Sequence, residues 1–156
     1  MDITIRKAQE KDWPFIFGLL KLANMHYIPS KEMPALTREN YFVAESGREI
    51  LGFCGYKILS DTEAKTELMV VDPVARGRGV GHKLQVRRME DMLGKGIKTL
   101  ITNTDLPATI EWYKKHFGYK EVGKLKKFHE FGDPNIDEWT TLQVDLVRWN
   151  RDRKRD

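Results

Sequence analysis

A turn with alternating glycines, set between a strand-like segment and a helical segment, constrains the fold of this chain most. The segment Thr66–Val71 is rich in residues that favour strands, and Gly77, Gly79 and Gly81 follow it. Beyond the glycines, apolar residues within 86–93 recur at helical spacing. A strand that passes through such a turn into a helix predicts an α/β domain whose chemistry lies where the strand ends.

The same turn has the properties of an anion-binding site. Glycines let the backbone approach a ligand closely, and the N–H groups of the first helical turn, at the positive end of the helix dipole, attract an anion. Arg76 and Arg78 add positive charge. The turn lacks the lysine and hydroxyl residue of a P-loop, and its glycine spacing differs from the dinucleotide fingerprint. These residues favour a pyrophosphate-type ligand other than ATP or NAD, and a tight turn that needs glycine only for its geometry is the alternative.

The rest of the chain alternates between strand and helix signals. Further strands are expected at Ile3–Lys7, Tyr41–Glu45, Ile50–Ser60, Lys98–Thr102, Tyr119–Phe131 and Glu138–Val147. Helices are expected at Trp13–Leu22, after the glycine turn, and before Gly118. Asp12 is the expected cap of the first helix, and Asp105 with Pro107 opens the last one. This order predicts one mixed sheet with helices packed on it.

Length and composition fit a single globular domain. The chain has 156 residues, of which 40% are hydrophobic and 32% charged, with a net charge of +4. No apolar run approaches the roughly 18 residues of a membrane span, and the N-terminal segment lacks the pattern of a signal peptide. We therefore expect a cytoplasmic protein without a membrane partner.

The C-terminal end is basic. We place the domain at residues 1–147 and a tail at residues 148–156, which holds Arg148, Arg151, Arg153, Lys154 and Arg155. Such a tail is usually a solvated terminus, so a nucleic-acid partner is not the first expectation. The single cysteine, Cys54, lies in an apolar segment and is expected in the core. The four histidines lack ligand spacing, so no metal site is expected.

The motif Arg76-x-x-Gly79-x-Gly81, preceded by Val71-Asp72-Pro73, resembles the acetyl-CoA pyrophosphate loop of the GCN5-related N-acetyltransferase (GNAT) superfamily. Three further segments resemble the same superfamily in the same order: IRKAQEKDW, YFVAESGREILG and TIEWYKKHFGYKEVG. The resemblance covers nearly the whole chain. It implies a single-domain α/β (α+β) fold with a mixed, mostly antiparallel sheet that splays after its fourth strand and is flanked by helices.

The resemblance also implies which residues bind acetyl-CoA. The backbone of the fourth strand would bind the pantetheine arm, the glycine turn would bind the pyrophosphate, and an asparagine after the fifth strand would contact the cofactor further along. The matching positions are Met69, Val70, Val71, Arg76, Gly77, Arg78, Gly79, Val80, Gly81 and Asn103. For Asn103, a turn or capping role is the alternative.

Two catalytic residues follow from the same resemblance. Tyr113 matches the tyrosine that protonates the departing CoA thiolate, although it also belongs to an apolar stripe and could simply be core. Glu67 is the candidate base because it shares strand parity with Met69 and Val71. The superfamily's glutamate more often falls where this chain has Lys65. Glu63 is therefore a rival for Glu67, and a solvent-facing strand position is the structural alternative.

The resemblance implies direct transfer of acetyl from acetyl-CoA to a primary amine of a small molecule, a peptide N-terminus or a lysine. Two segments would shape the acceptor site, Met25–Arg38 and Phe131–Trp139. Within them Tyr27, Trp139, Asp137 and Glu138 could receive a cationic or aromatic amine. The alternatives are an acyl-CoA-binding sensor without turnover and an RNA- or ribosome-associated factor that uses the basic tail. Homodimers are common in the superfamily, so a homodimer is possible here.

Overall fold

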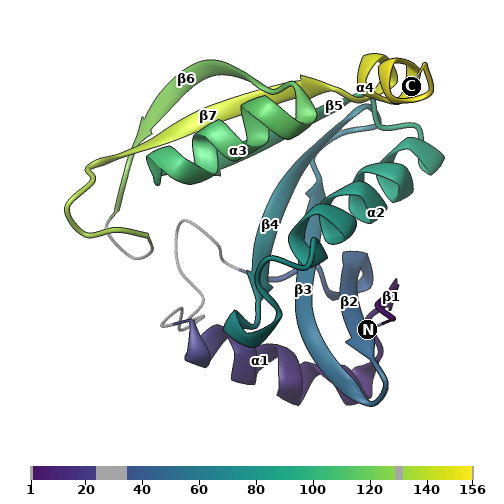
Figure 1. The fold of residues 1–156 in the computed structure, drawn as a ribbon. Helices are drawn as coiled ribbons and strands as arrows, with labels where there is room; N and C mark the ends of the chain where they lie inside the picture. Colours follow the sequence, from purple (N-terminus) through teal and green to yellow (C-terminus); the bar gives the residue numbers. More distant parts are fainter. Residues whose placement is uncertain (1, 24–34, 129–131, 156) are drawn as a thin grey trace. The chain divides into compact units, whose positions relative to one another are not determined.

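The computed structural model describes residues 2–23, 35–128 and 132–155, which fall into two compact units (Figure 1). Among these residues, the first unit comprises 2–23, 35–57 and 67–91, and the second comprises 58–66, 92–128 and 132–155. The strand β4 (Glu63–Val71) contributes its first half to the second unit and its second half to the first.

The strands form a seven-stranded mixed sheet in the order β1-β2-β3-β4-β5-β7-β6. Besides β4, these strands are β1 (Thr4–Lys7), β2 (Tyr41–Ser46), β3 (Glu49–Ile58), β5 (Thr99–Thr104), β6 (Lys120–Lys126) and β7 (Glu138–Asp145). The pairs β1·β2, β2·β3, β5·β7 and β6·β7 are antiparallel, whereas β4 and β5 are parallel. The α/β class and the mixed, mostly antiparallel sheet are thus confirmed.

The fourth strand leaves its neighbour early. The β4–β5 register pairs Glu63 with Thr99 and ends where Lys65 meets Ile101, although β4 continues to Val71. The later residues of β4, 66–71, lie beyond this register. The backbone groups in this half of β4 are the ones that the resemblance assigns to cofactor binding.

In the first unit, helices cover both faces of the sheet. The helix α1 (Trp13–Leu22) begins and ends as expected, and its Ile16 packs with Phe53 of β3 in one buried cluster. On β3 the next residue, Cys54, contacts the helix α2 (Val80–Gly94), and its thiol lies 3.5 Å from the Leu84 carbonyl oxygen. Successive strand residues point to opposite faces, so α1 and α2 lie on opposite sides of these strands. Cys54 is fully buried, which confirms its place in the core.

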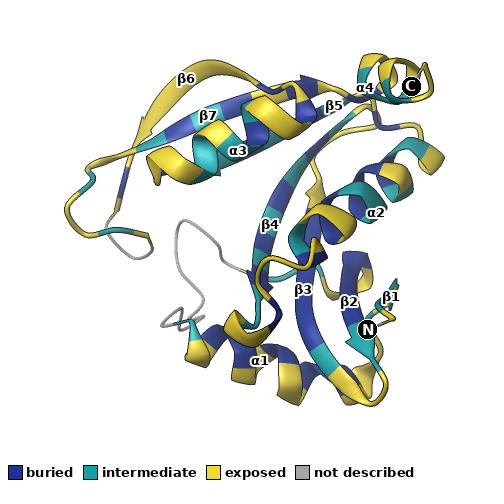
Figure 2. Cartoon of the chain, viewed as in Figure 1, coloured by how far each residue is buried: buried dark blue, intermediate teal, exposed yellow. Residues whose placement is uncertain are grey.

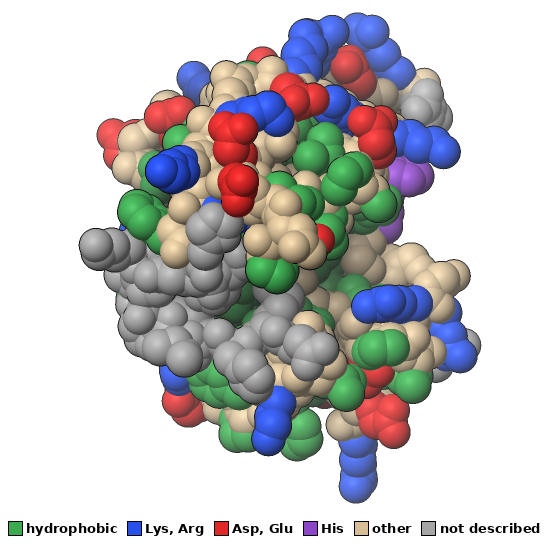
Figure 3. Space-filling view, turned by 90° about the vertical axis from the view of Figure 1, so that its left-hand side faces the viewer, with side chains coloured by type: hydrophobic (Ala, Val, Ile, Leu, Met, Phe, Trp, Pro, Cys, Tyr) green, Lys and Arg blue, Asp and Glu red, His purple; other side chains and the backbone are tan. Residues whose placement is uncertain are grey.

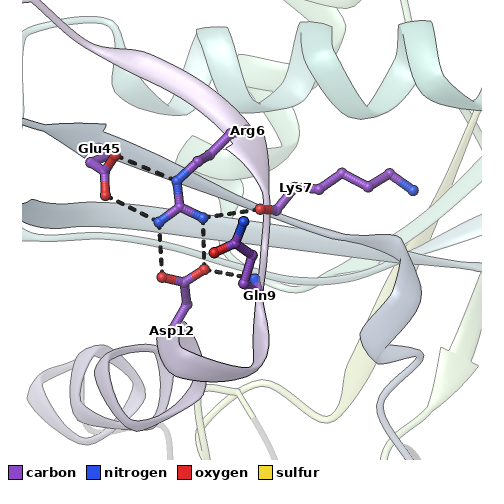
Figure 4. Close-up of polar contacts among 5 residues, drawn as sticks. All are labelled: Arg6, Lys7, Gln9, Asp12 and Glu45. Atoms are coloured by element: carbon purple, nitrogen blue, oxygen red, sulfur yellow. Dashed lines mark hydrogen bonds and ion pairs between the residues drawn. The ribbon is translucent and has the colours of Figure 1, made fainter.

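The start of α1 differs from the expectation in one respect. Asp12 occupies the N-cap position, but its carboxylate makes no capping bond to the helix. It accepts hydrogen bonds from the Arg6 guanidinium at 2.7 and 2.9 Å and from the Gln9 N–H at 2.7 Å (Figure 4). Arg6 also donates to Glu45 of β2 at 3.0 Å. A charged donor from β1 outcompetes the neutral N–H groups of the helix because charge-assisted hydrogen bonds are stronger.

In the second unit, the helix α3 (Pro107–Phe117) ends as predicted, because Gly118 adopts a left-handed conformation with φ of 70°. The apolar stripe of α3 is also confirmed, since Tyr113 and Phe117 are buried and Tyr113 packs against Tyr119 at a ring distance of 4.9 Å. Figure 2 shows a contrast in burial within this unit. β6 is exposed along its whole length, whereas buried residues alternate with less buried ones along β7.

Asp105 precedes α3 without capping it, because the N-cap residue is Leu106. The Asp105 carboxylate instead accepts a hydrogen bond from Lys127 Nζ at 2.7 Å and one from the Asp133 N–H at 2.6 Å. Lys127 also donates to the Asp133 carbonyl oxygen at 2.9 Å. The loop that follows Gly132 is therefore fixed to the start of α3 by a buried ion pair.

The C-terminal segment is a helix rather than a frayed tail. The strand β7 ends at Asp145, and α4 spans Leu146–Arg153. The reason is local, because the Asp145 side chain accepts the Arg148 N–H at 3.0 Å and caps the helix. Figure 3 shows Lys and Arg side chains at its upper right edge. Because the two views differ by a turn about the vertical axis, this edge is level with α4 in Figure 1.

Candidate active site

The glycine turn begins with a tightly bonded proline turn at the end of β4. The Asp72 N–H donates to the Leu51 carbonyl oxygen of β3 at 2.7 Å, which keeps the strand end attached to the sheet. The Asp72 carboxylate accepts the Val74 N–H at 3.1 Å and thereby caps the short helical turn Pro73–Ala75. The side chain of Ala75 is buried, so the turn is anchored on both sides before the glycines begin.

Two of the glycines are required by backbone conformation. Gly77 and Gly79 have φ angles of 80° and 75°, which side chains with a Cβ atom rarely adopt. A Cβ atom at either position would meet nothing within 4 Å, so the backbone there is also open to a ligand. Gly81 has a different role inside α2, because a Cβ there would lie 3.7 Å from Val71 and 3.9 Å from Met69. The start of α2 is thereby held close to the final residues of β4.

The electrostatics of the turn suit an anion. Arg76 and Arg78 are exposed, and α2 begins at Val80 directly after them. The Lys83 N–H donates to the Gly79 carbonyl oxygen at 3.0 Å, so the N–H groups of Val80 and Gly81 lie in the first turn, where a helix offers them no acceptor. Two arginines and the positive end of a helix dipole are therefore combined within a few residues of the open glycine backbone.

The residues of β4 alternate as the sequence predicts. Leu68 and Val70 are buried in the core of the first unit, while Glu67, Met69 and Val71 are only half-buried. Val70 is therefore a core residue whose side chain packs against α1, and only its backbone could contact a cofactor. The rival residue Glu63 lies at the opposite end of the strand, in the part that pairs with β5.

Glu67 is held by three hydrogen bonds from two residues that the sequence analysis did not single out. The Thr37 N–H and the Tyr41 hydroxyl both donate to Oε1 at 2.9 Å, and the Thr37 hydroxyl donates to Oε2 at 3.0 Å. Burial, together with the nearby charge of Glu67, raises the pKa of Tyr41, so Tyr41 stays protonated at neutral pH and acts as a donor. No local sequence pattern connects Thr37 with a strand thirty residues later in the chain.

The two other predicted site residues belong to the second unit. Tyr113 of α3 is 6% exposed and packs against Trp112 at a ring distance of 5.0 Å. Asn103 of β5 accepts the Thr141 hydroxyl through its side-chain oxygen at 2.7 Å. Asn103 thus links β5 to β7 through its side-chain oxygen. The glycine turn, the end of β4 and Glu67 come together in the first unit, while Tyr113 and Asn103 are placed within the second.

Much of the predicted acceptor region lies outside the described residues. This applies to residues 24–34 of the segment Met25–Arg38, with Tyr27 and His26, and to His129 and Phe131. Asp137 and Glu138 are exposed, and Trp139 is half-buried with Lys127 Nζ 4.6 Å from its ring centre. Within 2–23, 35–128 and 132–155, no three His, Cys, Asp or Glu side chains are grouped as metal ligands would be. In the same ranges, no helix combines the length and apolar character needed to cross a membrane.

Comparison with known proteins agrees with this arrangement. The acetyltransferase (GNAT) domain family matches residues 37–121, which include Glu67, the glycine turn and Tyr113. The chain is 30% identical over 98 residues to N-alpha-acetyltransferase RimI of Mycobacterium tuberculosis. That match covers 61% of this chain and 61% of the relative, so it spans about three fifths of the curated protein.

Solved structures share the fold at low sequence identity. Ard1 from Thermoplasma volcanium superimposes with a TM-score of 0.77 at 20% identity, covering 93% of this chain and 98% of that one. The protein yncA from Salmonella typhimurium, solved with its cofactor acetyl-CoA, gives a TM-score of 0.72 at 16% identity, covering 94% and 95%. The family match extends over more than half of the sequence and over the residues that build the glycine turn. The chain belongs to the GNAT acetyltransferase family.

Proposed function

We propose that this protein is an N-acetyltransferase that moves acetyl directly from acetyl-CoA to a primary amine. The observation that carries the proposal is the turn between β4 and α2. Two glycines with positive φ, two exposed arginines and a helix start are combined there with an open backbone. Such a site suits a diphosphate, and membership of the GNAT acetyltransferase family supports acetyl-CoA as the ligand that carries it.

The residues present fit acetyl-CoA. Arg76, Arg78 and the N–H groups at the start of α2 would bind the pyrophosphate. The backbone of Met69–Val71, which lies beyond the β4–β5 register, would hydrogen-bond the pantetheine arm as an added strand does. Acetyl-CoA supplies an activated acetyl group as a thioester. A backbone N–H of this stretch would stabilise the negative charge that develops on the carbonyl oxygen during attack.

The acetyl group passes directly from CoA to the amine, without a covalent intermediate on the enzyme. The amine nitrogen attacks the thioester carbon, a C–N bond forms and the C–S bond breaks. The ammonium form of the acceptor gives one proton to a base before attack, and a second N–H proton is lost as the amide forms. The CoA thiolate takes up one proton, so one proton is released to solvent overall. A lysine-type amine with a pKa of about 10 is mostly protonated at neutral pH, and so is a peptide α-amine with a pKa of about 8. A proton acceptor is therefore needed before attack. We assign Glu67 as that acceptor, directly or through one water, and Tyr113 as the proton donor to the thiolate.

A peptide N-terminal amine is the acceptor we would test first. The curated relative with 30% identity is named an N-alpha-acetyltransferase, which supports an α-amine over a lysine side chain. The amine panel should contain peptides with a free N-terminus, N-terminally blocked lysine peptides, polyamines and amino acids. Release of free CoA thiol from acetyl-CoA reports turnover for each of them.

The cofactor site is tested by Gly79→Ala with Gly47→Ala as its matched control. Gly47 lies in the turn between β2 and β3 and has φ of 61°, and a Cβ at either position would be unobstructed. Both variants should lose about 1 kcal/mol of stability from backbone strain. Only Gly79→Ala should weaken acetyl-CoA binding in calorimetry, by about tenfold or more, because it changes the backbone that contacts the diphosphate.

The outcomes separate the candidate functions. Binding of acetyl-CoA with thiol release stimulated by one amine class supports the transferase. Binding without release by any amine would favour the acyl-CoA sensor. Equal binding by Gly79→Ala and the wild type would remove the glycine turn from the cofactor site.

A further inference from the structure

The Glu67 carboxylate has nearly all of its acceptor capacity in use. Each carboxylate oxygen can accept two hydrogen bonds. Oε1 receives two of them, one from the Thr37 N–H and one from the Tyr41 hydroxyl, both at 2.9 Å. Oε2 receives one, from the Thr37 hydroxyl at 3.0 Å. The donors among residues 2–23, 35–128 and 132–155 therefore leave one acceptor position on Oε2.

Both donors are held firmly by the first unit. The Tyr41 side chain is fully buried, and its ring packs between Trp13 at 5.1 Å and Phe53 at 6.2 Å. The same ring covers Gly55, where a Cβ atom would collide with it. The Thr37 carbonyl oxygen accepts the Asn40 N–H at 2.9 Å, which closes the short helical turn before β2. A donor on a packed ring and a donor in a closed turn restrict the orientation of the carboxylate that they bind.

We infer that Thr37 and Tyr41 are positioning residues for Glu67, and that they leave Oε2 as the single oxygen through which Glu67 accepts the amine proton. The inference rests on the proposed function and deepens it. The ammonium proton of the acceptor moves to the remaining lone pair of Oε2, directly or through one water, and the neutral amine then attacks acetyl-CoA. The proton later leaves to solvent, which returns the carboxylate to its starting state.

Thr37 offers the sharper test, because its two bonds can be separated. Thr37→Val keeps the backbone N–H, and its side chain is close in shape to threonine, but it removes the hydroxyl that fixes Oε2. Thr37→Ser keeps the hydroxyl and removes only a methyl group. Tyr41→Phe removes one of the two donors to Oε1 and leaves Oε2 bonded. These variants should be combined with Glu67→Gln, and melting temperature and acetyl-CoA affinity should be measured for each.

The expected pattern is a loss in turnover with unchanged cofactor binding. With a peptide that has a free N-terminus as acceptor, Thr37→Val should lower kcat by about tenfold while the KM for acetyl-CoA stays the same. Thr37→Ser should retain at least half of the wild-type kcat. Tyr41→Phe should lower kcat less than Thr37→Val, because the Oε2 contact survives.

The combination with Glu67→Gln decides whether Thr37 acts through the carboxylate. If it does, Thr37→Val adds no further loss in a Glu67→Gln background, since residues acting as one unit are not additive. A full additional loss there, or wild-type kcat in Thr37→Val, would overturn the inference. Failure of the proposed function looks different, because the wild type itself would then release no thiol with any amine.

Discussion

Each unit of this protein has a helix that begins beside an aspartate bonded to a cation from elsewhere in the chain. Asp12 before α1 pairs with Arg6, and Asp105 before α3 pairs with Lys127, at 2.7 Å in both cases. The two sites differ in burial and in composition. The Arg6 side chain is 23% exposed and is shared with a second carboxylate, Glu45, whereas Lys127 is 0% exposed and has one carboxylate partner in the described structure.

This difference decides what each pair contributes. Arg6 satisfies two carboxylates at the sheet edge with part of its guanidinium in water, so the loss of one bond is partly compensated by solvent. The Lys127 side chain is fully buried, and its other contacts with described residues are the Asp133 carbonyl oxygen and the Trp139 ring. Removing one partner of a buried pair leaves an uncompensated charge in the interior. We therefore expect the loss of stability in each variant to follow the burial of the ion pair rather than the distance between its charged atoms.

The largest effect is expected for Lys127→Met. It leaves the Asp105 carboxylate buried and without its cation, which costs about 3–5 kcal/mol of unfolding free energy. Urea unfolding at neutral pH measures this loss. The double variant Lys127→Met/Asp105→Asn should recover at least half of it, because the buried charge is removed. No recovery in the double variant would show that packing of the Lys127 chain, rather than its charge, stabilises the loop.

A smaller loss, about 1–2 kcal/mol, is expected for Arg6→Lys, measured by the same unfolding curve. A single ammonium cannot bridge Asp12 and Glu45 with the forked geometry drawn in Figure 4. Arg148→Lys serves as the control, since Arg148 is 62% exposed and lies 3.8 Å from Asp152. Arg148→Lys should stay within about 0.5 kcal/mol of the wild type. An equal loss in both variants would remove the contrast between shared and exposed arginines.

Low pH should reduce the stabilisation from both the Asp12 and the Asp105 ion pairs. Hydrogen bonds from Arg6 hold the pKa of Asp12 below its usual value. Burial alone would raise the pKa of Asp105, but the bonds from Lys127 and the Asp133 N–H outweigh it and the pKa is lowered. A lowered folded pKa stabilises the protein above the unfolded value of about 3.9, and this stability is lost as pH falls through the folded pKa. Unfolding free energy should therefore decline below about pH 4, and less steeply in Asp105→Asn.

The smallest effect is expected where the distance is shortest. Lys114 Nζ lies 2.6 Å from Glu121, closer than Lys127 lies to Asp105, but both side chains are partly in water. Glu121→Gln should leave the melting temperature unchanged within the error of calorimetry, because solvent replaces the lost contact. A clear drop in melting temperature would mean that distance ranks these pairs better than burial does.

Features set by neighbouring residues are predictable from the sequence, whereas contacts between distant elements are not. The span of α1, the stop at Gly118 and the glycine turn follow from residues that are neighbours in the chain, and the structure agrees. The capping role predicted for Asp12 was wrong because its carboxylate binds Arg6 of β1 instead. The helix α3 opens at Pro107 as predicted, but the bond from Asp105 to Lys127, 22 residues away, has no local sequence signal. The role of Thr37 could not be predicted from the sequence for the same reason. Its contact with Glu67 exists only once β2 and β4 have joined the same sheet.

The buried thiol has a practical consequence for experiments on this protein. Cys54 is the single cysteine of the chain, and burial raises its pKa to about 11, so little reactive thiolate is present at neutral pH. A cysteine introduced at an exposed position can therefore be labelled selectively without deleting the native one. Val74 is 72% exposed and lies just before the glycine turn. A fluorophore attached through Val74→Cys would give an optical signal for ligand arrival at that turn.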